Sequence, residues 1–415
     1  MSAFSLMVVR GCGDVGSAVA HALYMQGAKV ILHDEPAPAH PRRGMAFADA
    51  LFAGTATLEG VVAQRAPNLD TLLSIGAIDE LVPVCDAPLG ELMQAYPPDV
   101  LIDARMRKRS AIEDQRTLAP TVVGLGPGFD TRTNCHIAIE TAWGECLGYV
   151  VREGRTAALE GEPRPLDGVG RERFVYAPTQ GVWHTALQIG SRVTKGPSIG
   201  HVEGHQVVAP LDGFLRGLSH DGVAVAKRQK IVEIDPRDVP QVFGQGERPR
   251  AIAKGVLKAL NLHGDAERQF FGFEREFEAT LDCMPMSVRL KMDLCGIKLS
   301  LAQWRALPAE ARRTTLDAQC ESHVDVRRLR RFLEWWIREG GGTTPLQIQI
   351  DHSDWQVATR VPDQVNYVLA SSGLPHLPQP AWARLDDLQR FALCKLTTKG
   401  QARTLPVALV EFGLA

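Results

Sequence analysis

A glycine-rich loop between a short apolar run and a stretch of helical periodicity constrains the fold of this chain more than any other feature. The apolar run covers residues 6–9, the loop reads Gly11-Cys12-Gly13-Asp14-Val15-Gly16, and a second apolar run covers residues 29–32. In such a strand–loop–helix–strand unit, Gly11 permits the tight turn, Gly13 lets a pyrophosphate approach the backbone, and Gly16 lets the helix pack closely on the strand. The pattern predicts a Rossmann-like nucleotide-binding unit.

The surroundings of this loop suit a dinucleotide. A phosphate at the start of the helix would meet unpaired N–H groups and the positive end of the helix dipole. Asp34 ends the second strand, near the position where an acidic residue accepts a ribose hydroxyl. The alternative is that the glycines serve only the turn and the packing, in a related fold that binds no dinucleotide.

Two further apolar runs end in loops that a parallel sheet would bring to the same edge. Residues 100–102 lead into Asp103-Ala104-Arg105, and residues 121–123 lead into a loop from Gly124 to Gly128. Arg105, Arg107, Lys108 and Arg109 form a basic run, which is either a phosphate-binding element or a solvated helix start. The predicted ligand-binding residues are Gly11, Cys12, Gly13, Asp14, Gly16, Asp34, Arg105, Gly124, Gly126 and Gly128.

An internal repeat marks the middle of the chain. A shift of 32 positions superposes seven identical residues, from Ala177 on Ala209 to Ile199 on Ile231, and each copy reads as short strands with glycine turns. The pattern predicts two interlocking copies in a small all-β domain that resembles the barrel-sandwich hybrid of biotinyl and lipoyl carriers. The connecting hairpin at residues 203–206 has no lysine, so no covalent biotin or lipoate is expected. His201 and His205 beside it are metal ligands or solvated turn residues.

Helical periodicity dominates the remainder of the chain. Residues 290–297, 310–315, 324–339 and 385–396 read as helices, and loops are expected at residues 340–342 and 375–380. We therefore predict an α/β Rossmann-like domain at residues 1–165, a β barrel-sandwich-like domain at 166–262 and a mostly α domain at 266–415.

Several motifs in order make residues 1 to about 260 similar to the YqeB family. They are Arg10 to Asp14, Asp103 to Arg109, Gly124 to Phe129, Ile139-Glu140-Thr141 and Lys230 to Arg237. The resemblance implies a link to the selenium-dependent molybdenum hydroxylase system and a distant relation to XdhC factors, which handle molybdenum cofactor. Many relatives carry Ala where this chain has Cys12, which is either a small buried filler or a soft group beside a phosphate.

The C-terminal segment resembles the nitrate reductase-associated (NarM) family over nearly its whole length. The matching stretches are Cys283 to Met286, Lys291 to Leu299, Cys320 and Leu388 to Leu393. The resemblance implies a role in making assimilatory nitrate reductase active, and Cys283, Cys295 and Cys320 fall on the family's cysteine positions, whereas Cys394 does not. These thiols are ligands for an iron–sulfur cluster, zinc or molybdenum, or they are buried structural cysteines.

A basic helix face lies in the same segment. Arg327, Arg328, Arg330 and Arg331 precede two tryptophans, Trp335 and Trp336. This face is either solvated or a docking surface for an acidic client or a phosphate-bearing cofactor.

Composition excludes several classes of protein. The 46 Lys and Arg residues nearly balance the 48 Asp and Glu residues, whereas a dedicated nucleic-acid binder is usually strongly basic. No apolar run approaches the ~18 residues that span a bilayer, and the start of the chain lacks the basic region of a signal peptide. Eight scattered cysteines do not form a secreted disulfide pattern, so a reducing cytoplasm is the expected location.

These features together predict a maturation factor that binds molybdenum cofactor, or a related nucleotide, and helps to deliver it. The expected partners are nitrate reductase or another molybdoenzyme and proteins of cofactor biosynthesis. Bacterial forms of the cofactor carry a nucleotide through a pyrophosphate, which the glycine loop suits. The alternatives are an NAD(P)-dependent oxidoreductase and a non-catalytic adaptor for nitrate reductase. No catalytic constellation is evident, so a cofactor-handling role is favoured over a metabolic enzyme.

Overall fold

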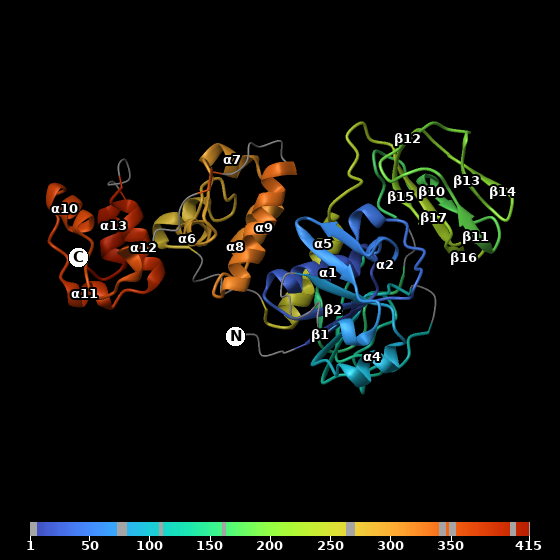
Figure 1. Ribbon diagram of the computed structural model, residues 1–415, viewed down its shortest axis with the longest axis horizontal. Helices are drawn as coiled ribbons and strands as arrows, with labels where there is room; N and C mark the ends of the chain where they lie inside the picture. The colour runs from blue at the N-terminus through green and yellow to red at the C-terminus, as the bar shows by residue number, and fades with distance from the viewer. Residues whose placement is uncertain are drawn as a thin grey trace. The chain divides into compact units, whose positions relative to one another are not determined.

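The computed structural model divides the chain into two compact units, Met1–His263 and Gly264–Ala415. It describes residues 6–72, 81–107, 111–159, 163–262, 270–339, 346–347, 354–398 and 404–414. Each unit has its own secondary structure and core, and each is considered by itself below (Figure 1).

A nine-stranded sheet forms the centre of the first unit, with the order β3-β4-β5-β2-β1-β6-β7-β8-β9. The neighbours from β4 to β8 pair parallel, while β3 and β9 pair antiparallel at the two edges. The strands are β1 (Met7–Arg10), β2 (Val30–His33), β3 (Thr55–Leu58), β4 (Val61–Arg65), β5 (Val82–Cys85), β6 (Val100–Asp103), β7 (Thr121–Leu125), β8 (Ile137–Ile139) and β9 (Val150–Val151). Because the central strands are buried on both faces, they are continuous apolar runs.

Helices accompany this sheet unevenly. The predicted strand–loop–helix–strand unit is present as β1, α1 (Asp14–Met25) and β2, and α5 (Glu247–Ala259) packs against α1. The other elements are η1 (Arg43–Met45), α2 (Ala50–Ala53) and α4 (Leu89–Ala95). The described residues contain no helix between β6 and β7 or between β7 and β8. The sequence prediction is thus confirmed as a large mixed sheet with helices, although two crossovers depart from a regular doubly wound pattern.

Two four-stranded antiparallel sheets follow, with the orders β10-β17-β15-β12 and β14-β13-β11-β16. Their strands are β10 (Phe174–Tyr176), β11 (Gly181–His184), β12 (Arg192–Val193), β13 (Ser198–Val202), β14 (His205–Val208), β15 (Gly213–Leu218), β16 (Ala224–Val225) and β17 (Lys230–Asp235). The 32-residue shift places β11 on β15, β12 on β16 and β13 on β17. Gly181 pairs with Val225, and its repeat equivalent Gly213 pairs with Val193, so each copy completes the sheet of the other.

The second unit is mostly helical, as the sequence predicts. Its elements are η4 (Gly272–Phe277), α6 (Met286–Leu294), β18 (Ile297–Lys298), α7 (Leu301–Ala306), α8 (Ala309–Asp317), α9 (His323–Glu339), β19 (Leu346–Gln347), η5 (Asp354–Gln356), α10 (Asp363–Ser371), α11 (Gln379–Ala383), α12 (Asp387–Leu396) and α13 (Leu405–Glu411). A core around Leu369, Trp382, Phe391 and Leu405 holds α10 to α13 together.

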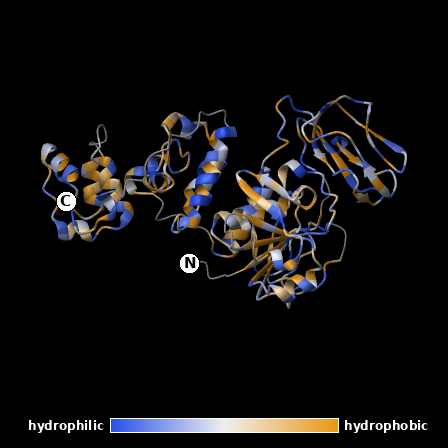
Figure 2. Ribbon diagram, viewed as in Figure 1, coloured by the Kyte–Doolittle hydropathy of each residue, from blue (hydrophilic) through white to orange (hydrophobic). Residues whose placement is uncertain are grey.

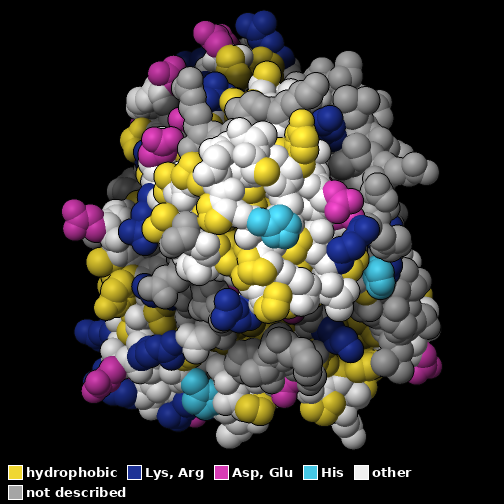
Figure 3. All heavy atoms as spheres, turned by 90° about the vertical axis from the view of Figure 1, so that its left-hand side faces the viewer, with side chains coloured by type: hydrophobic (Ala, Val, Ile, Leu, Met, Phe, Trp, Pro, Cys, Tyr) yellow, Lys and Arg dark blue, Asp and Glu magenta, His cyan; other side chains and the backbone are white. Residues whose placement is uncertain are grey.

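The longest helix of this unit, α9, is strongly amphipathic, and hydrophilic and hydrophobic residues alternate along it in Figure 2. It buries Leu329, Phe332, Leu333 and Ile337. On the face that Figure 3 turns toward the viewer, hydrophobic side chains lie between Lys and Arg side chains. Among the helices that the structure describes, none combines the length and the apolar composition needed to cross a membrane.

The glycine loop provides a test of the packing. A Cβ atom on Gly16 would lie 1.8 Å from the carbonyl oxygen of Gly11, whereas a Cβ on Gly90 in α4 would meet nothing within 4 Å. We expect Gly16→Ala to destabilise the chain by about 1–3 kcal/mol, because the backbone must move. Gly90→Ala, in the first turn of α4, should instead stabilise it slightly, by at most about 0.5–1 kcal/mol, since alanine loses less conformational entropy than glycine in a helix. Urea unfolding followed by circular dichroism measures both; equal effects would contradict the packing.

Candidate functional site

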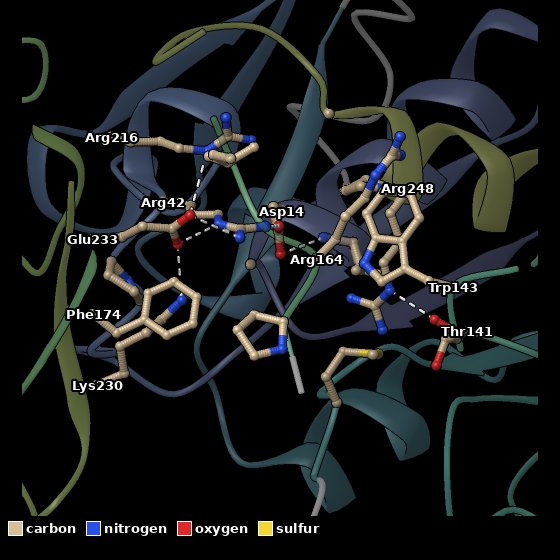
Figure 4. A pocket seen from close by; sticks show the side chains of 18 of the residues that line it. Asp14, Arg42, Thr141, Trp143, Arg164, Phe174, Arg216, Lys230, Glu233 and Arg248 are labelled. Carbon is tan, nitrogen blue, oxygen red and sulfur yellow. Dashed lines mark hydrogen bonds and ion pairs between the residues drawn. The ribbon is translucent and has the colours of Figure 1, made fainter. Parts of the chain in front are cut away.

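A cavity of about 850 Å³ lies in the first unit, between loops at the carboxyl ends of the large sheet and the strands of the antiparallel sheets (Figure 4). Gly13, Asp14 and residues 140–143 line it from one side, and residues of β10, β15 and β17 line it from the other. Nine of the lining residues are Lys or Arg, against five Asp or Glu. The cationic residues are Arg42, Arg164, Arg171, Arg173, Arg216, Arg228, Lys230, Arg237 and Arg248. The excess of positive charge suits an anionic ligand.

The most concentrated charge surrounds Glu233 in β17, whose side chain is fully buried. Its carboxylate accepts hydrogen bonds from Arg42 Nε at 2.9 Å, from Lys230 Nζ at 3.0 Å and from Arg173. Arg216 Nε lies 3.5 Å from the same carboxylate. We call these five residues the Glu233 cluster. One carboxylate thus orders four cationic side chains at the cavity wall.

Neighbouring carboxylates compensate only part of this charge. Arg42 also pairs with Asp14 at the start of α1 at 2.8 Å, and Arg216 lies 3.4 Å from Asp235, which Arg237 binds as well. Burial alone would raise the pKa of Glu233, but the charges of Lys230 and Arg42 hold it well below its ordinary value. Glu233 is therefore ionised at neutral pH, and the cations around it remain in excess.

The pKa of Lys230 is lowered, because it is buried and lies near the charge of Arg42, while Glu233 opposes both effects. Its amine also lies 4.4 Å from the centre of the Phe174 ring. A buried ammonium beside another cation gains from any additional negative charge. An anion near Lys230 would therefore oppose both effects that lower its pKa.

An aromatic side chain and two further arginines lie across the cavity, as Figure 4 shows. Trp143 is 40% exposed, and the guanidinium of Arg164 lies 4.8 Å from the centre of its ring. Arg248 Nε donates to the backbone oxygen of Thr141 at 2.7 Å. This side offers a flat apolar surface as well as positive charge.

Glu140 positions the Trp143 loop. Its buried carboxylate accepts hydrogen bonds from the backbone N–H groups of Thr141, Ala142 and Ala157 at 2.6–2.7 Å. The carboxylate thus joins two segments of the cavity wall and leaves the side chain of Trp143 exposed. Glu140 therefore has a structural role, which its place in the motif Ile139-Glu140-Thr141 did not predict.

Of the ten ligand-binding residues predicted from the sequence, Gly13 and Asp14 line the cavity. The other eight do not, and several have packing roles. Gly11 has a φ of +108° and lies against the backbone of Ala104, and a Cβ on Gly124 would lie 2.0 Å from the Phe129 ring. These eight are Gly11, Cys12, Gly16, Asp34, Arg105, Gly124, Gly126 and Gly128.

Asp34 holds the glycine loop in place. Its carboxylate accepts the N–H of Cys12 at 2.5 Å and a hydrogen bond from His40 Nε2 at 2.8 Å. Burial raises the pKa of Asp34, but the hydrogen bond and charge of His40 lower it, and the net effect is a decrease. Burial lowers the pKa of His40, but contact with Asp34 raises it, and the net effect is an increase. The His40 ring would lie 3.2 Å from a Cβ on Gly13, so it covers the loop. Burial raises the pKa of the Cys12 thiol, which agrees with a small buried filler.

The two described arginines of the predicted basic run, Arg105 and Arg107, also form ion pairs with carboxylates. Arg105 pairs with Asp103 and Glu113, and Arg107 pairs with Glu113. Met106, between them, is the residue of this segment that lines the cavity. Lys108 and Arg109 lie outside the described residues.

The sequence also predicts three cysteines and two histidines as metal ligands. Cys295 is buried and its thiol donates to the backbone oxygen of Val326 at 3.5 Å, whereas Cys283 and Cys320 are half-buried. The described part of the chain contains no group of three or more His, Cys, Asp or Glu residues arranged to hold a metal ion, so Cys283, Cys295 and Cys320 do not form one. His201 and His205 are exposed on β13 and β14.

The sequence analysis missed Arg42, Trp143, Arg173, Arg216 and Arg248 as cavity residues. They come from separate segments, and no spacing along the chain relates them. The available signals were the motifs Ile139-Glu140-Thr141 and Lys230 to Arg237, which contain Glu140, Lys230 and Glu233. These residues line one cavity only because the fold brings their segments together, and the sequence pattern does not predict that proximity.

The Glu233 cluster makes a prediction about stability. Glu233→Gln removes the charge that holds four cations, so we expect a loss of about 3–5 kcal/mol in the free energy of unfolding. The control Glu247→Gln breaks an exposed pair with Arg164 and should cost less than about 1 kcal/mol.

The same pair of variants predicts a pH dependence. Because the pKa of Glu233 is lower in the folded state, its contribution is complete above the ordinary value of 4.5 and is lost as the pH falls toward the lower pKa. Urea unfolding between pH 7 and pH 3 should show a shallower decline for Glu233→Gln than for the unaltered chain. An unchanged slope would contradict the assignment.

Comparisons with known proteins agree with both segments identified in the sequence. Residues 270–412 match the model of the conserved nitrate reductase-associated protein family. The N-terminal segment is 36% identical over 260 residues to YqeB of Escherichia coli (strain K12), a protein described as uncharacterized. The alignment covers 62% of this chain and 48% of YqeB, so the chain spans about half the length of that relative.

Similarity to a solved structure is much weaker. The product-bound structure of the ectoine utilization protein EutE (DoeB) from Ruegeria pomeroyi is 10% identical, and the match covers 56% of this chain and 85% of that one. The TM-score is 0.18, which supports no argument about fold or function. The chain is therefore a YqeB-like segment joined to a segment that matches the nitrate reductase-associated family.

Proposed function

We propose that this chain is an accessory factor for nitrate reductase or another molybdoenzyme, and that its cavity holds molybdenum cofactor or a related nucleotide. The joining of a YqeB-like segment to a nitrate reductase-associated segment supports the accessory role. The observation that carries the binding function is the cavity of about 850 Å³ with nine cationic side chains and an exposed tryptophan in its lining. When bound, such a cofactor would supply the molybdenum pterin that the client enzyme uses.

The donor groups of the cavity fit the chemistry of this ligand. Arginine forks bind phosphate oxygens through two parallel hydrogen bonds, and Arg42, Arg173 and Arg216 are already ordered by Glu233. Ordered side chains lose less entropy on binding, which increases affinity. Trp143 offers a flat face for the heterocycle. We assign the phosphate end of the ligand to the Glu233 cluster and its ring to Trp143.

We further propose that the large sheet is Rossmann-like and that the antiparallel sheets form a barrel-sandwich hybrid. The parallel strands β5-β2-β1-β6-β7-β8 have the order of a dinucleotide-binding sheet, in which β1 is followed by a glycine loop and a helix. The start of α1 has no side-chain cap at Gly13, and Arg42 pairs with Asp14 in its first turn. An anion at this end of α1 would therefore also meet Arg42.

The two alternative functions have less support. In a nicotinamide-dependent oxidoreductase, an acidic residue after the second strand binds the ribose. Asp34 instead binds Cys12 and His40, and the His40 ring covers Gly13. A non-catalytic adaptor would have no need for a cavity that collects cationic side chains. Both remain outcomes of the experiment that follows.

Analysis of bound material tests the proposal. The full chain is purified anaerobically from a host supplied with molybdate, molybdenum is measured by mass spectrometry, and the pterin is measured by fluorescence after oxidation. We expect near-stoichiometric molybdenum and a pterin phosphate or nucleotide. The matched variants are Arg248→Met in the cavity and Arg132→Met, which removes an exposed partner of Asp130.

Arg248→Met should reduce the pterin content at least tenfold, since a charge-assisted hydrogen bond contributes about 1.5–3 kcal/mol, while Arg132→Met should retain it. A bound nicotinamide nucleotide would favour the oxidoreductase instead. An empty protein that captures nitrate reductase would favour the adaptor, and an equal loss in both variants would contradict the assignment of the cavity.

The division of the cavity into a phosphate end and a ring end makes a separate prediction. Trp143→Leu should weaken the binding of a pterin nucleotide by about 1–3 kcal/mol, which is the contribution of stacking one base on an aromatic side chain. It should leave the binding of inorganic pyrophosphate unchanged, because the Glu233 cluster is intact. Titration calorimetry with both probes measures the difference. A parallel loss for both probes would contradict the assignment of the ring to Trp143.

A further inference from the structure

The cavity of the first unit has aromatic side chains in two separate parts of its lining. Trp143 lies in the loop between β8 and β9, whereas Phe174 and Tyr176 belong to β10. In Figure 4, Phe174 lies to the left and Trp143 to the right of the labelled side chains. Asp14 and Arg42 lie between them in the same view. The cavity thus has two aromatic ends with charged residues between them.

Tyr176 is the exposed aromatic side chain at the β10 end. The Phe174 ring already contacts cations, since the guanidinium carbon of Arg173 lies 4.2 Å and the amine of Lys230 lies 4.4 Å from its centre. Tyr176, two residues further along the strand, is 37% exposed, and its hydroxyl accepts a hydrogen bond from Arg171 at 3.2 Å. A second flat apolar surface, held at its hydroxyl, is therefore available to a ligand.

Cationic side chains lie between the two aromatic ends. Arg42 pairs with Asp14 at 2.8 Å. Burial raises the pKa of this carboxyl, but the charges of Arg42, Lys230 and Arg248 lower it on balance. Arg248 donates through Nε to Thr141, and its two terminal nitrogens form no hydrogen bond with the residues that the structure describes. A guanidinium with both terminal nitrogens free can bind a phosphate through two hydrogen bonds.

The volume of the cavity is also large for one ring and one phosphate. Small-molecule sites range from about 300 to 1,000 Å³, and the volume of about 850 Å³ lies near the upper end of that range. The cavity therefore has room for a second ring beyond the one assigned to Trp143.

We propose that the ligand of this cavity carries two planar ring systems joined through a pyrophosphate, with one ring on Trp143 and the other on Tyr176. The pyrophosphate then meets Arg42 and Arg248 rather than the glycine loop, which His40 covers. This inference rests on the proposed function, because it concerns the same cavity, and it adds the class of ligand. A ligand with a single ring would leave one aromatic end of the cavity empty.

Two probes that differ by one ring test the inference. Diadenosine pyrophosphate carries two adenines, whereas ADP-ribose has the same pyrophosphate linkage and charge but one adenine. Adenine suits this purpose, because stacking on an aromatic side chain tolerates any base. Titration calorimetry uses the full chain, purified from a host without added molybdate. Diadenosine pyrophosphate should bind about 5- to 150-fold more tightly than ADP-ribose, which is the contribution of stacking one further base.

Tyr176→Leu should remove this difference. We expect it to lower the affinity for diadenosine pyrophosphate to that for ADP-ribose, whose single adenine can still lie on Trp143. Tyr176→Phe keeps the ring and should retain the difference, although it loses the hydrogen bond from Arg171. Tyr149→Leu is the matched control, because Tyr149 is also an exposed tyrosine and does not line the cavity. Circular dichroism establishes that each variant is folded.

The outcomes separate this inference from the function on which it rests. Equal affinities of the unaltered chain for the two probes, with inorganic pyrophosphate still bound, would overturn the two-ring ligand and leave the proposed function intact. A Tyr176→Leu variant that keeps the full difference would overturn the assignment of the second ring. If neither probe nor inorganic pyrophosphate binds, the proposed function fails together with the inference.

Discussion

The buried carboxylate of Glu233 is the contact on which the arrangement of the first unit depends. It joins β17 to Arg42, which lies after β2, and Arg42 continues to Asp14 at the start of α1. Two further hydrogen bonds support this bridge: the backbone N–H of Leu218 donates to the backbone oxygen of Pro41, and the Ser219 hydroxyl donates to that of Ala39. The large sheet and the antiparallel sheets are thereby held against each other with the cavity between them. Loss of one carboxylate would leave four cations without their common partner.

The short segment from Ala39 to Arg43 lies against the glycine loop and the start of α1. His40 covers Gly13, Arg42 pairs with Asp14, and Arg43 Nε donates to the backbone oxygen of Leu218. This one segment thus contacts the glycine loop, the start of α1 and the antiparallel sheets. In a dinucleotide-binding fold a pyrophosphate lies over the glycine loop, whereas here the His40 ring fills part of that position. The cationic side chains instead line the cavity beyond the loop.

Local patterns in the sequence predict much of the fold and little of the site. The apolar runs and the glycine loop predict β1, α1 and β2, because period and turn chemistry are local properties. The 32-residue repeat predicts the antiparallel sheets, since Gly181 and Gly213 occupy equivalent positions at the start of β11 and β15. Arg42 and Trp143 could not be predicted in this way, because segments without periodicity bring them together. Asp34 was expected to bind a ligand, but its carboxylate binds the backbone of the glycine loop.

The composition of the Glu233 cluster argues for a ligand beyond the protein itself. A network that served only stability would pair its buried charges evenly, because each uncompensated cation costs desolvation free energy. Here Arg42, Arg173, Arg216 and Lys230 share Glu233, and the further carboxylates Asp14 and Asp235 compensate only Arg42 and Arg216 in part. The pKa of Lys230 is lowered by burial and by Arg42. Residues that depart from such pairing are expected at functional sites, where a ligand supplies the missing charge. An anion bound in this cavity would compensate the excess and, since it binds only the folded state, would also stabilise the fold.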